Sequence, residues 1–167
     1  DLIGEETINS VLKILMKKHR DQVDLDLTTL EFLSELYKVS PVQYHELIND
    51  WFKRVITYDL SIEESSYMAL ANGTYEITAK VKANRFETTG KEETSRIDIN
   101  EPIKVGVFTE HPSDLKNDSG ILYYESIIID KEVSIIKIIV KELPKYIAID
   151  PYGTRSDENF TDNLIEL

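Results

Sequence analysis

The period of the hydrophobic residues changes near residue 58, and this change constrains the fold more than any other feature of the sequence. Before it, apolar residues recur three or four positions apart, which is typical of amphipathic helices. After it, residues 73–86 (GTYEITAKVKANRF) alternate between apolar and polar, which is typical of a strand with one buried face. The sequence therefore predicts an α+β chain, with a helical segment at residues 1–58 and a β domain at residues 59–167.

About three helices are expected in the first segment. The apolar spacing predicts one helix over residues 5–19. A second helix begins at Thr28, which forms a capping-box pattern with Glu31, and it cannot continue past Pro41. The same spacing then extends over residues 40–59 and predicts a third helix there. The β domain would follow this helix directly.

Several short strands are expected in the second segment. Asn72 and Gly73 form a hairpin-turn signal directly before the alternating stretch. The strand VSIIKIIV, residues 133–140, is apolar on both faces, so we expect it at the centre of a sheet. Short strands separated by turns predict an antiparallel β-sandwich of immunoglobulin-like or fibronectin-like type, with an acidic C-terminal tail. Its further strands are expected at residues 95–99, 103–109, 121–130, 133–142 and 145–150.

The charge and the cysteine content exclude several kinds of partner and site. The chain has a formal net charge of −12, which disfavours nucleic acid and anionic membrane surfaces as partners. It has no cysteine, so disulfides, thiolate zinc sites and a cysteine nucleophile are excluded. Its apolar runs have the length of strands, so no direct membrane insertion is expected. It begins with DLIGEE rather than with Met, and we expect it to be part of a longer protein.

The most suggestive catalytic motif is HELIN, which begins at His45. A gluzincin zinc site reads His-Glu-x-x-His, so that two His side chains share one helix face and bind the metal. Here Asn49 replaces the second His, and Met68 occupies the position of the distal glutamate ligand. His19 and His111 are isolated in the sequence, and no serine-nucleophile elbow is present. We therefore expect no catalytic residue, no metal and no cofactor in this chain, which by itself is not an enzyme.

The C-terminal stretch DPYGTRSDENFTDN contains oxygen ligands of the kind that calcium binds. The weak candidates are Asp157, Asn159 and Asp162, because calcium takes carboxylate, amide and carbonyl oxygens. Their spacing matches the first positions of an EF-type loop, but Asp162 stands where that loop requires Gly. The alternative is that these side chains bond to the local backbone, as Asp and Asn do in turns. The turn interpretation is favoured.

The order of several short segments resembles that of a known enzyme family. These segments are residues 30–59 ending in ITYD, GTYEIT from Gly73, IKVGVF from Ile103, and IDPY followed by Arg155, Asp157, Asp162 and Asn163. Together they resemble the C-terminal region of bacterial zinc aminopeptidases of the alanyl-aminopeptidase type, which are gluzincin metallopeptidases. In one subgroup the peptidase is fused behind the membrane-spanning permease of an ABC transporter. The resemblance covers residues 28–167.

The resemblance implies a non-catalytic accessory region at the C-terminus of a membrane-linked bacterial enzyme. The zinc and its ligands would lie in the upstream catalytic domain, which would be the main partner of this chain. The chain would be a soluble part of a membrane-anchored protein, on either side of the membrane. An apolar helix face separated from that domain would favour a homo-oligomer of the isolated chain. The alternatives are a stand-alone β-sandwich binding or adhesion module and a hydrolase whose site assembles in space.

The resemblance also implies a structural clasp near the C-terminus. Asp150 and Pro151 would end the last strand of the β domain. Arg155 would pair with a neighbouring carboxylate such as Asp157, and Asn163 would complete the clasp. These residues are expected to hold the domain closed rather than to take part in chemistry.

Overall fold

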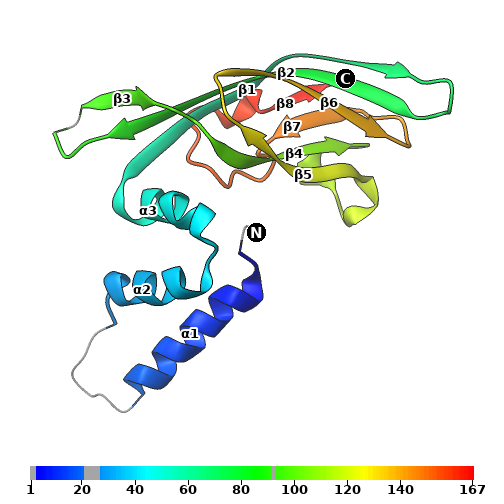
Figure 1. Ribbon diagram of the computed structural model, residues 1–167. Coiled ribbons are helices and arrows are strands. Elements are labelled where there is room, and N and C mark those ends of the chain that lie inside the picture. The colour runs from blue at the N-terminus through cyan, green and yellow to red at the C-terminus, as the bar shows by residue number, and fades with distance from the viewer. Residues whose placement is uncertain (1–2, 21–26, 92) are drawn as a thin grey trace. The chain divides into compact units, whose positions relative to one another are not determined.

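The computed structural model describes residues 3–20, 27–91 and 93–167, and it confirms the α+β class. Three N-terminal helices are followed by two antiparallel sheets, consistent with a β-sandwich (Figure 1). The chain divides into two compact units, Asp1–Lys53 and Arg54–Leu167. The division falls five residues before the boundary at residue 58 that the sequence suggested.

The helical unit contains α1 (Glu5–His19), α2 (Thr29–Val39), the short 3-10 helix η1 (Val42–Tyr44) and α3 (His45–Lys53). The first helix has the predicted bounds. The predicted capping box at the start of α2 is also present, since the Glu31 amide donates to Thr28 Oγ1 at 3.2 Å and the Thr28 amide donates to Glu31 Oε2 at 3.3 Å. The helices bury a small common core, which consists of Val11, Leu15, Leu33, Leu36 and Ile48.

The third helix is shorter than the sequence suggested. It ends at Lys53, and β1 begins at Val55, so residues 54–59 are not helical. The prediction was wrong here because this stretch is rich in β-branched residues, which pack well in a sheet and lower helix propensity. Arg54 also forms an ion pair with Glu87 on the neighbouring strand, which fixes the start of β1 against that strand.

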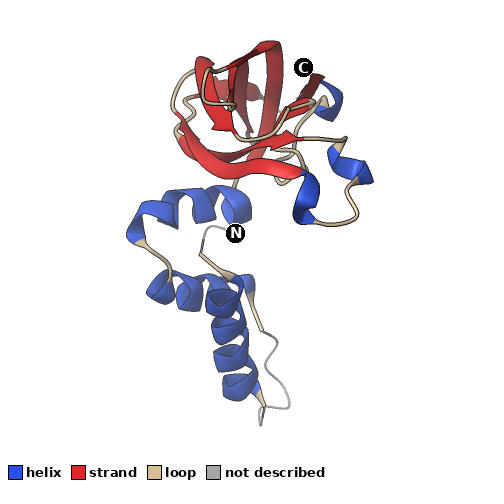
Figure 2. Cartoon of the chain, turned by 90° about the vertical axis from the view of Figure 1, so that its right-hand side faces the viewer, coloured by secondary structure: helices blue, strands red, loops and turns tan. Residues whose placement is uncertain are grey.

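Each of the two sheets in the second unit has four strands. The first sheet contains β1 (Val55–Ala69), β2 (Tyr75–Thr88), β3 (Thr94–Ile97) and β6 (Val133–Val140), with β2 pairing to the other three. The second sheet contains, in spatial order, β5 (Ile121–Ile129), β4 (Glu101–Phe108), β7 (Tyr146–Ile149) and β8 (Leu164–Glu166). All these pairings are antiparallel. Figure 2 shows strands, in red, making up most of this unit.

The core of the second unit is built from alternate residues of both sheets. On β2 the predicted alternation is confirmed, because Ile77, Ala79, Val81 and Ala83 are all 0 % exposed. The facing strand β4 contributes Ile103, Val105 and Val107 to the same apolar cluster. Burial of one face of each sheet is the interaction that makes a two-layer β structure stable.

The strand β6 lies at the edge of its sheet and not at its centre as expected. Among the described residues it pairs with β2 alone. Ile136 and Ile138 face the core, whereas Ile135 and Ile139 are 60 % and 59 % exposed. An apolar run therefore predicted the strand correctly but not its position, because the sequence of one strand does not reveal whether a second layer covers its other face.

A close approach at Gly106 shapes the second sheet. A Cβ atom at this residue would lie 2.3 Å from the ring of Phe108, which is itself fully buried. The pairing of β4 with β5 shifts register between Val107 and Phe108, which is the mark of a β-bulge. The missing side chain lets the Phe108 ring lie close against the backbone of Gly106. None of the helices in the described ranges is long and apolar enough to cross a membrane.

Candidate functional site

Residues 150–163, which we call the C-terminal strap, run along the outer edge of β1. The Tyr58 amide donates to the Ser156 carbonyl at 2.9 Å, and the Glu158 amide donates to the Tyr58 carbonyl at 3.1 Å. These two bonds form a parallel bridge between Tyr58 and Asp157. The strap therefore covers backbone groups at the start of a strand that would otherwise be unpaired.

The strap begins with a sharp turn at Asp150, directly after β7. Asp150 is fully buried and has a positive φ of 45°, a conformation that Asp and Asn tolerate better than most residues. One carboxylate oxygen accepts hydrogen bonds from the Thr154 amide at 3.0 Å and the Thr154 hydroxyl at 2.6 Å. The other accepts from the Arg155 amide at 2.8 Å. The buried Asp150 carboxylate of this turn thus accepts hydrogen bonds from three protein donors. One of these bonds fixes the Arg155 backbone, and the Arg155 side chain points inward from there.

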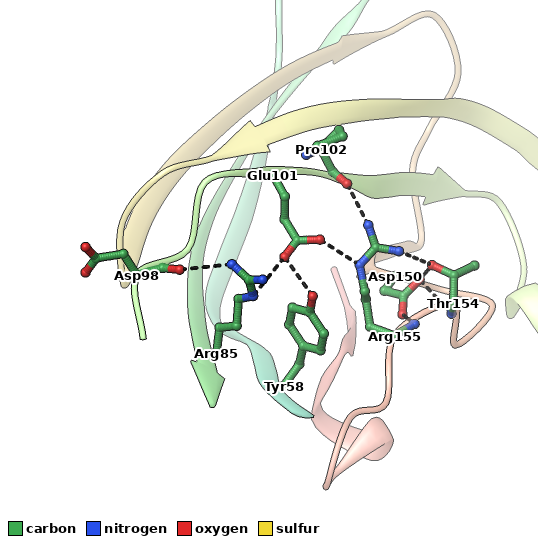
Figure 3. Close-up of polar contacts among 8 residues, drawn as sticks. All are labelled: Tyr58, Arg85, Asp98, Glu101, Pro102, Asp150, Thr154 and Arg155. Atoms are coloured by element: carbon green, nitrogen blue, oxygen red, sulfur yellow. Dashed lines mark hydrogen bonds and ion pairs between the residues drawn. The ribbon is translucent and has the colours of Figure 1, made fainter. Parts of the chain in front are cut away.

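The Arg155 side chain joins the strap to β4 (Figure 3). Its Nε atom donates to Glu101 Oε2 at 3.0 Å, and its Nη2 atom donates to the Pro102 carbonyl at 3.0 Å. The two charged side chains are only 8 % and 3 % exposed. An ion pair that is this buried and also hydrogen-bonded holds its partners far more firmly than a surface pair does.

Tyr58 and Arg85 complete the cluster around Glu101 from the other sheet (Figure 3). The Tyr58 hydroxyl donates to Glu101 Oε1 at 2.7 Å, and Arg85 Nε lies 3.6 Å from the same oxygen. Arg85 also donates from Nη1 to the Asp98 carbonyl at 3.2 Å. A single carboxylate on β4 is therefore bound by a phenol from β1, a guanidinium from β2 and a guanidinium from the strap.

The surroundings of Tyr58 in the cluster disfavour ionisation of its phenol. Burial, and after it the negative charge of Glu101, raises the pKa of Tyr58 well above its ordinary value. The phenol therefore remains a protonated donor, and the guanidinium of Arg155 lies 5.9 Å from the centre of its ring. We name Tyr58, Arg85, Glu101, Asp150 and Arg155 the buried clasp.

The calcium candidates of the strap are bonded to protein donors. Asp157 accepts from the Leu60 amide at 3.2 Å, the Asn163 side chain at 2.9 Å and the Asn159 amide at 3.0 Å. Asn159 donates to Asp162 Oδ2 at 2.7 Å. Within residues 3–20, 27–91 and 93–167, no group of three or more His, Asp or Glu side chains is arranged to hold a metal ion. The geometry is that of side chains bonded to local backbone and to one another in turns.

The structure brings together most of the predicted clasp residues but pairs them differently. Arg155 pairs with Glu101, a carboxylate on another strand, whereas the sequence had suggested a neighbouring carboxylate such as Asp157. Asp157 instead binds the β1 backbone and Asn163. Asp150 and Pro151 do follow a strand, β7, but the short strand β8 comes after them. The Asn163 carbonyl accepts from the Ile149 amide at 2.9 Å, which links the end of the strap to that strand.

Three members of the buried clasp were missed by the sequence reasoning, although the alternation pattern contained a signal for them. Arg85 continues the inward-facing row of β2 beyond Ala83, and Glu101 precedes the inward-facing row of β4 at Ile103. Tyr58 similarly stands two residues before buried Leu60. Two opposite charges on the core-facing rows of two strands would have indicated a buried ion pair, since charges are rarely buried unless they are paired.

The HELIN motif, His19 and His111 contact neighbouring side chains of the protein. The ring of His45 packs 4.9 Å from that of Tyr37, whose hydroxyl donates to Asn49 at 2.5 Å, so two HELIN residues contact α2. His19 Nε2 lies 3.6 Å from Glu31. His111 Nδ1 lies 2.8 Å from the Ser113 hydroxyl and also accepts from the Ser113 amide, as a residue that caps a short 3-10 turn does.

No protein-family model matches the chain, and no curated protein matches it significantly.

Proposed function

We propose that this chain is a non-catalytic accessory region from the C-terminal part of a membrane-linked bacterial zinc aminopeptidase. In this proposal the helical unit packs against the upstream catalytic domain, which holds the zinc. The sandwich braces that domain or binds a partner, and the buried clasp keeps the sandwich rigid. The choice of parent enzyme rests on the ordered sequence resemblance over residues 28–167.

The structural observation that carries the proposal is an open apolar groove in the helical unit. Its volume is about 620 Å³. Trp51 and Phe52 at its margin are 46 % and 43 % exposed, and the ring of Phe52 lies 5.7 Å from that of Phe32. Large aromatic side chains that are half exposed around a groove are typical of a surface that another protein element covers. Apolar members of its lining are Ile8, Phe32, Leu36, Ile48, Trp51 and Phe52.

The first test is the reading frame upstream of Asp1. The proposal predicts a His-Glu-x-x-His motif with its distal glutamate, preceded by membrane spans. It also predicts that the 167-residue chain alone does not hydrolyse alanyl-nitroanilide when zinc is supplied. Turnover by the purified chain would contradict the proposal. A frame without a peptidase would instead favour a stand-alone binding module.

A second test uses the groove. When the upstream catalytic part is produced as a separate polypeptide, it should bind the chain in solution. Phe52→Asp should weaken that binding at least tenfold, because a charge would be buried in an apolar contact. Phe160→Asp is the matched control, since Phe160 is 47 % exposed but belongs to the strap. If both variants bound the catalytic part equally well, the groove would not be part of the interface.

A further inference from the structure

The outer edge of β1 is covered over one part of its length only. The C-terminal strap bonds to Tyr58 and Leu60. Beyond Ile62 the strand continues to Ala69, and among the described residues it pairs there with β2 alone. The turn that follows it projects past the neighbouring strands (Figure 1). Residues 65–69 of this strand therefore present an edge that no described strand covers.

The backbone groups on this edge follow from the strand register. Tyr58 bonds to the strap through both its amide and its carbonyl, so its backbone points away from β2. On β2, Arg85 lies opposite Tyr58 and Ile77 lies opposite Tyr67. The positions of Arg85 and Ile77 along β2 differ by an even number. Because the direction of backbone groups alternates along an antiparallel ladder, Tyr67 also points its amide and carbonyl outward. The same holds for Ser65 and Ala69, which stand two residues to either side.

The composition of this edge differs from that of the other free edges. Residues 65–70 read SSYMAL and contain no charge, no Pro and no Gly. Natural sheets protect free edges with charged residues, especially Lys, or keep the edge strands very short. Here β6 carries Lys137 and β5 carries Glu125, while β3 and β8 have only four and three residues. Tyr67 and Met68, in contrast, are 42 % and 58 % exposed on an unprotected edge.

We propose that a second copy of this chain pairs with β1 along this edge, antiparallel and about a two-fold axis at Tyr67. The two Tyr67 residues would then exchange backbone hydrogen bonds, and Ser65 of each copy would do the same with Ala69 of the other. The two four-stranded sheets would become one continuous sheet. This surface is distinct from the groove of the helical unit, and the inference does not depend on the parent enzyme.

The choice of a second copy rests on the charges and side chains of this register. Ser66 stands opposite Met68, and the acidic Glu64 stands opposite Leu70, so no like charges meet. The Tyr67 rings form a cross-strand aromatic pair, which stabilises antiparallel strands. On β6, by comparison, a two-fold axis at Ile136 would place Lys131 opposite Lys141, and an axis at Lys137 would place the two copies of this lysine opposite each other. A symmetric interface requires this kind of self-complementarity.

Engineered cysteines give a register-specific test, because the chain has none of its own. Residues 66 and 68 form a non-hydrogen-bonded pair across the axis, with Cα atoms about 4.5 Å apart. That distance suits a disulfide. A mixture of S66C and M68C chains should therefore form a covalent dimer under mild oxidation, whereas either variant alone should form at least fivefold less. No covalent dimer in the mixture, or equal yields in all three samples, would overturn the proposal.

Sedimentation of the 167-residue chain supplies the second readout. We expect a reversible dimer that Tyr67→Lys weakens at least tenfold, because each copy would bring a charge to the axis. Ile139→Lys places the same charge on the edge of β6 and should leave the dimer unchanged. Phe52→Asp should leave it unchanged as well, since it alters only the groove. A chain that stays monomeric at about 0.5 mM, or a dimer that Phe52→Asp dissociates, would contradict pairing through β1.

Discussion

Arg155 and Glu101 lie 54 residues apart in the sequence, yet their side chains meet at 3.0 Å inside the sandwich. The same carboxylate accepts a hydrogen bond from Tyr58 on the other sheet. Glu101 therefore connects the C-terminal strap, β1 and β4 through one buried group. This connection explains how a strap that contributes no residue to the apolar core cluster stays fixed to the edge of β1.

Removing the charge of Glu101 should destabilise the sandwich strongly. In Glu101→Gln two guanidinium groups would keep their positive charges in a site that is almost closed to water. We expect the free energy of unfolding to fall by ~3 kcal/mol, the usual cost of breaking a buried ion pair. Urea unfolding followed by far-ultraviolet circular dichroism measures this loss. Glu142→Gln, at an exposed position, is the control and should change the stability by less than ~0.5 kcal/mol.

Tyr58 should make the stability fall at high pH. Its pKa is raised above the ordinary value of 10.0, so above pH 10 the unfolded chain releases the phenolic proton while the folded chain keeps it. The contribution of Tyr58 is thus complete below pH 10 and decreases as the pH rises further, with a limiting slope of about 1.4 kcal/mol per pH unit. Tyr58→Phe should remove that part of the slope.

Unfolding of both proteins between pH 9 and pH 11.5 checks this dependence. Some slope should remain in Tyr58→Phe, because burial also raises the pKa values of Tyr123 and Tyr124. Near neutral pH the variant should be less stable by ~1–3 kcal/mol, since it loses the hydrogen bond to a buried charged group. Identical slopes in the two proteins would show that Tyr58 ionises as readily in the folded chain as in the unfolded one.

The two glycines Gly106 and Gly90 should respond differently to substitution by alanine. A Cβ at Gly106 would meet the Phe108 ring at 2.3 Å, whereas a Cβ at Gly90 has no neighbour within 4 Å. Gly106→Ala must displace a buried ring and should cost ~1–3 kcal/mol, as overpacking does. Gly90→Ala should be neutral or slightly stabilising. Thermal midpoints of the two variants, measured side by side, test the contrast; equal midpoints would mean that the ring moves aside freely.

Thr28 should matter to the helical unit, while its neighbour Thr29 should not. Thr28 caps α2 by accepting the Glu31 amide, and Thr29 is the exposed first residue of that helix. Thr28→Ala should lower the stability of the unit by ~1 kcal/mol, the typical value of an N-cap. The fluorescence of Trp51, the one tryptophan of the chain, reports on this unit in urea. A loss as large in Thr29→Ala would indicate that the cap is not responsible.

Features set by neighbouring residues could be predicted from the sequence. The Thr28–Glu31 cap spans a single helical turn, and the alternation from Ile77 to Ala83 is fixed by the pleat of one strand. Both were confirmed. The end of α3 was missed although the β-branched residues that follow Arg54 are a local signal for a strand. The edge position of β6 could not be predicted in the same way, because it depends on which strands lie beside this segment.

The buried clasp shows the same limit within a site. Its two members in the strap, Asp150 and Arg155, had been named as clasp residues from the sequence resemblance. The partner of Arg155 was not predicted, because Asp157 lies only two residues away in the sequence whereas Glu101 lies on another strand. Long-range pairing is decided by the packing of the sheets.

A double-mutant cycle between Glu101 and Arg155 tests the central claim that this pair fastens the strap to the sandwich. The free energy of unfolding would be measured for the unmodified chain, Glu101→Gln, Arg155→Met and the double variant. We predict that the double variant loses less stability than the sum of the single losses, with a coupling of ~1–3 kcal/mol. Losses that simply add, within ~0.5 kcal/mol, would show that the two residues act independently and would contradict the account.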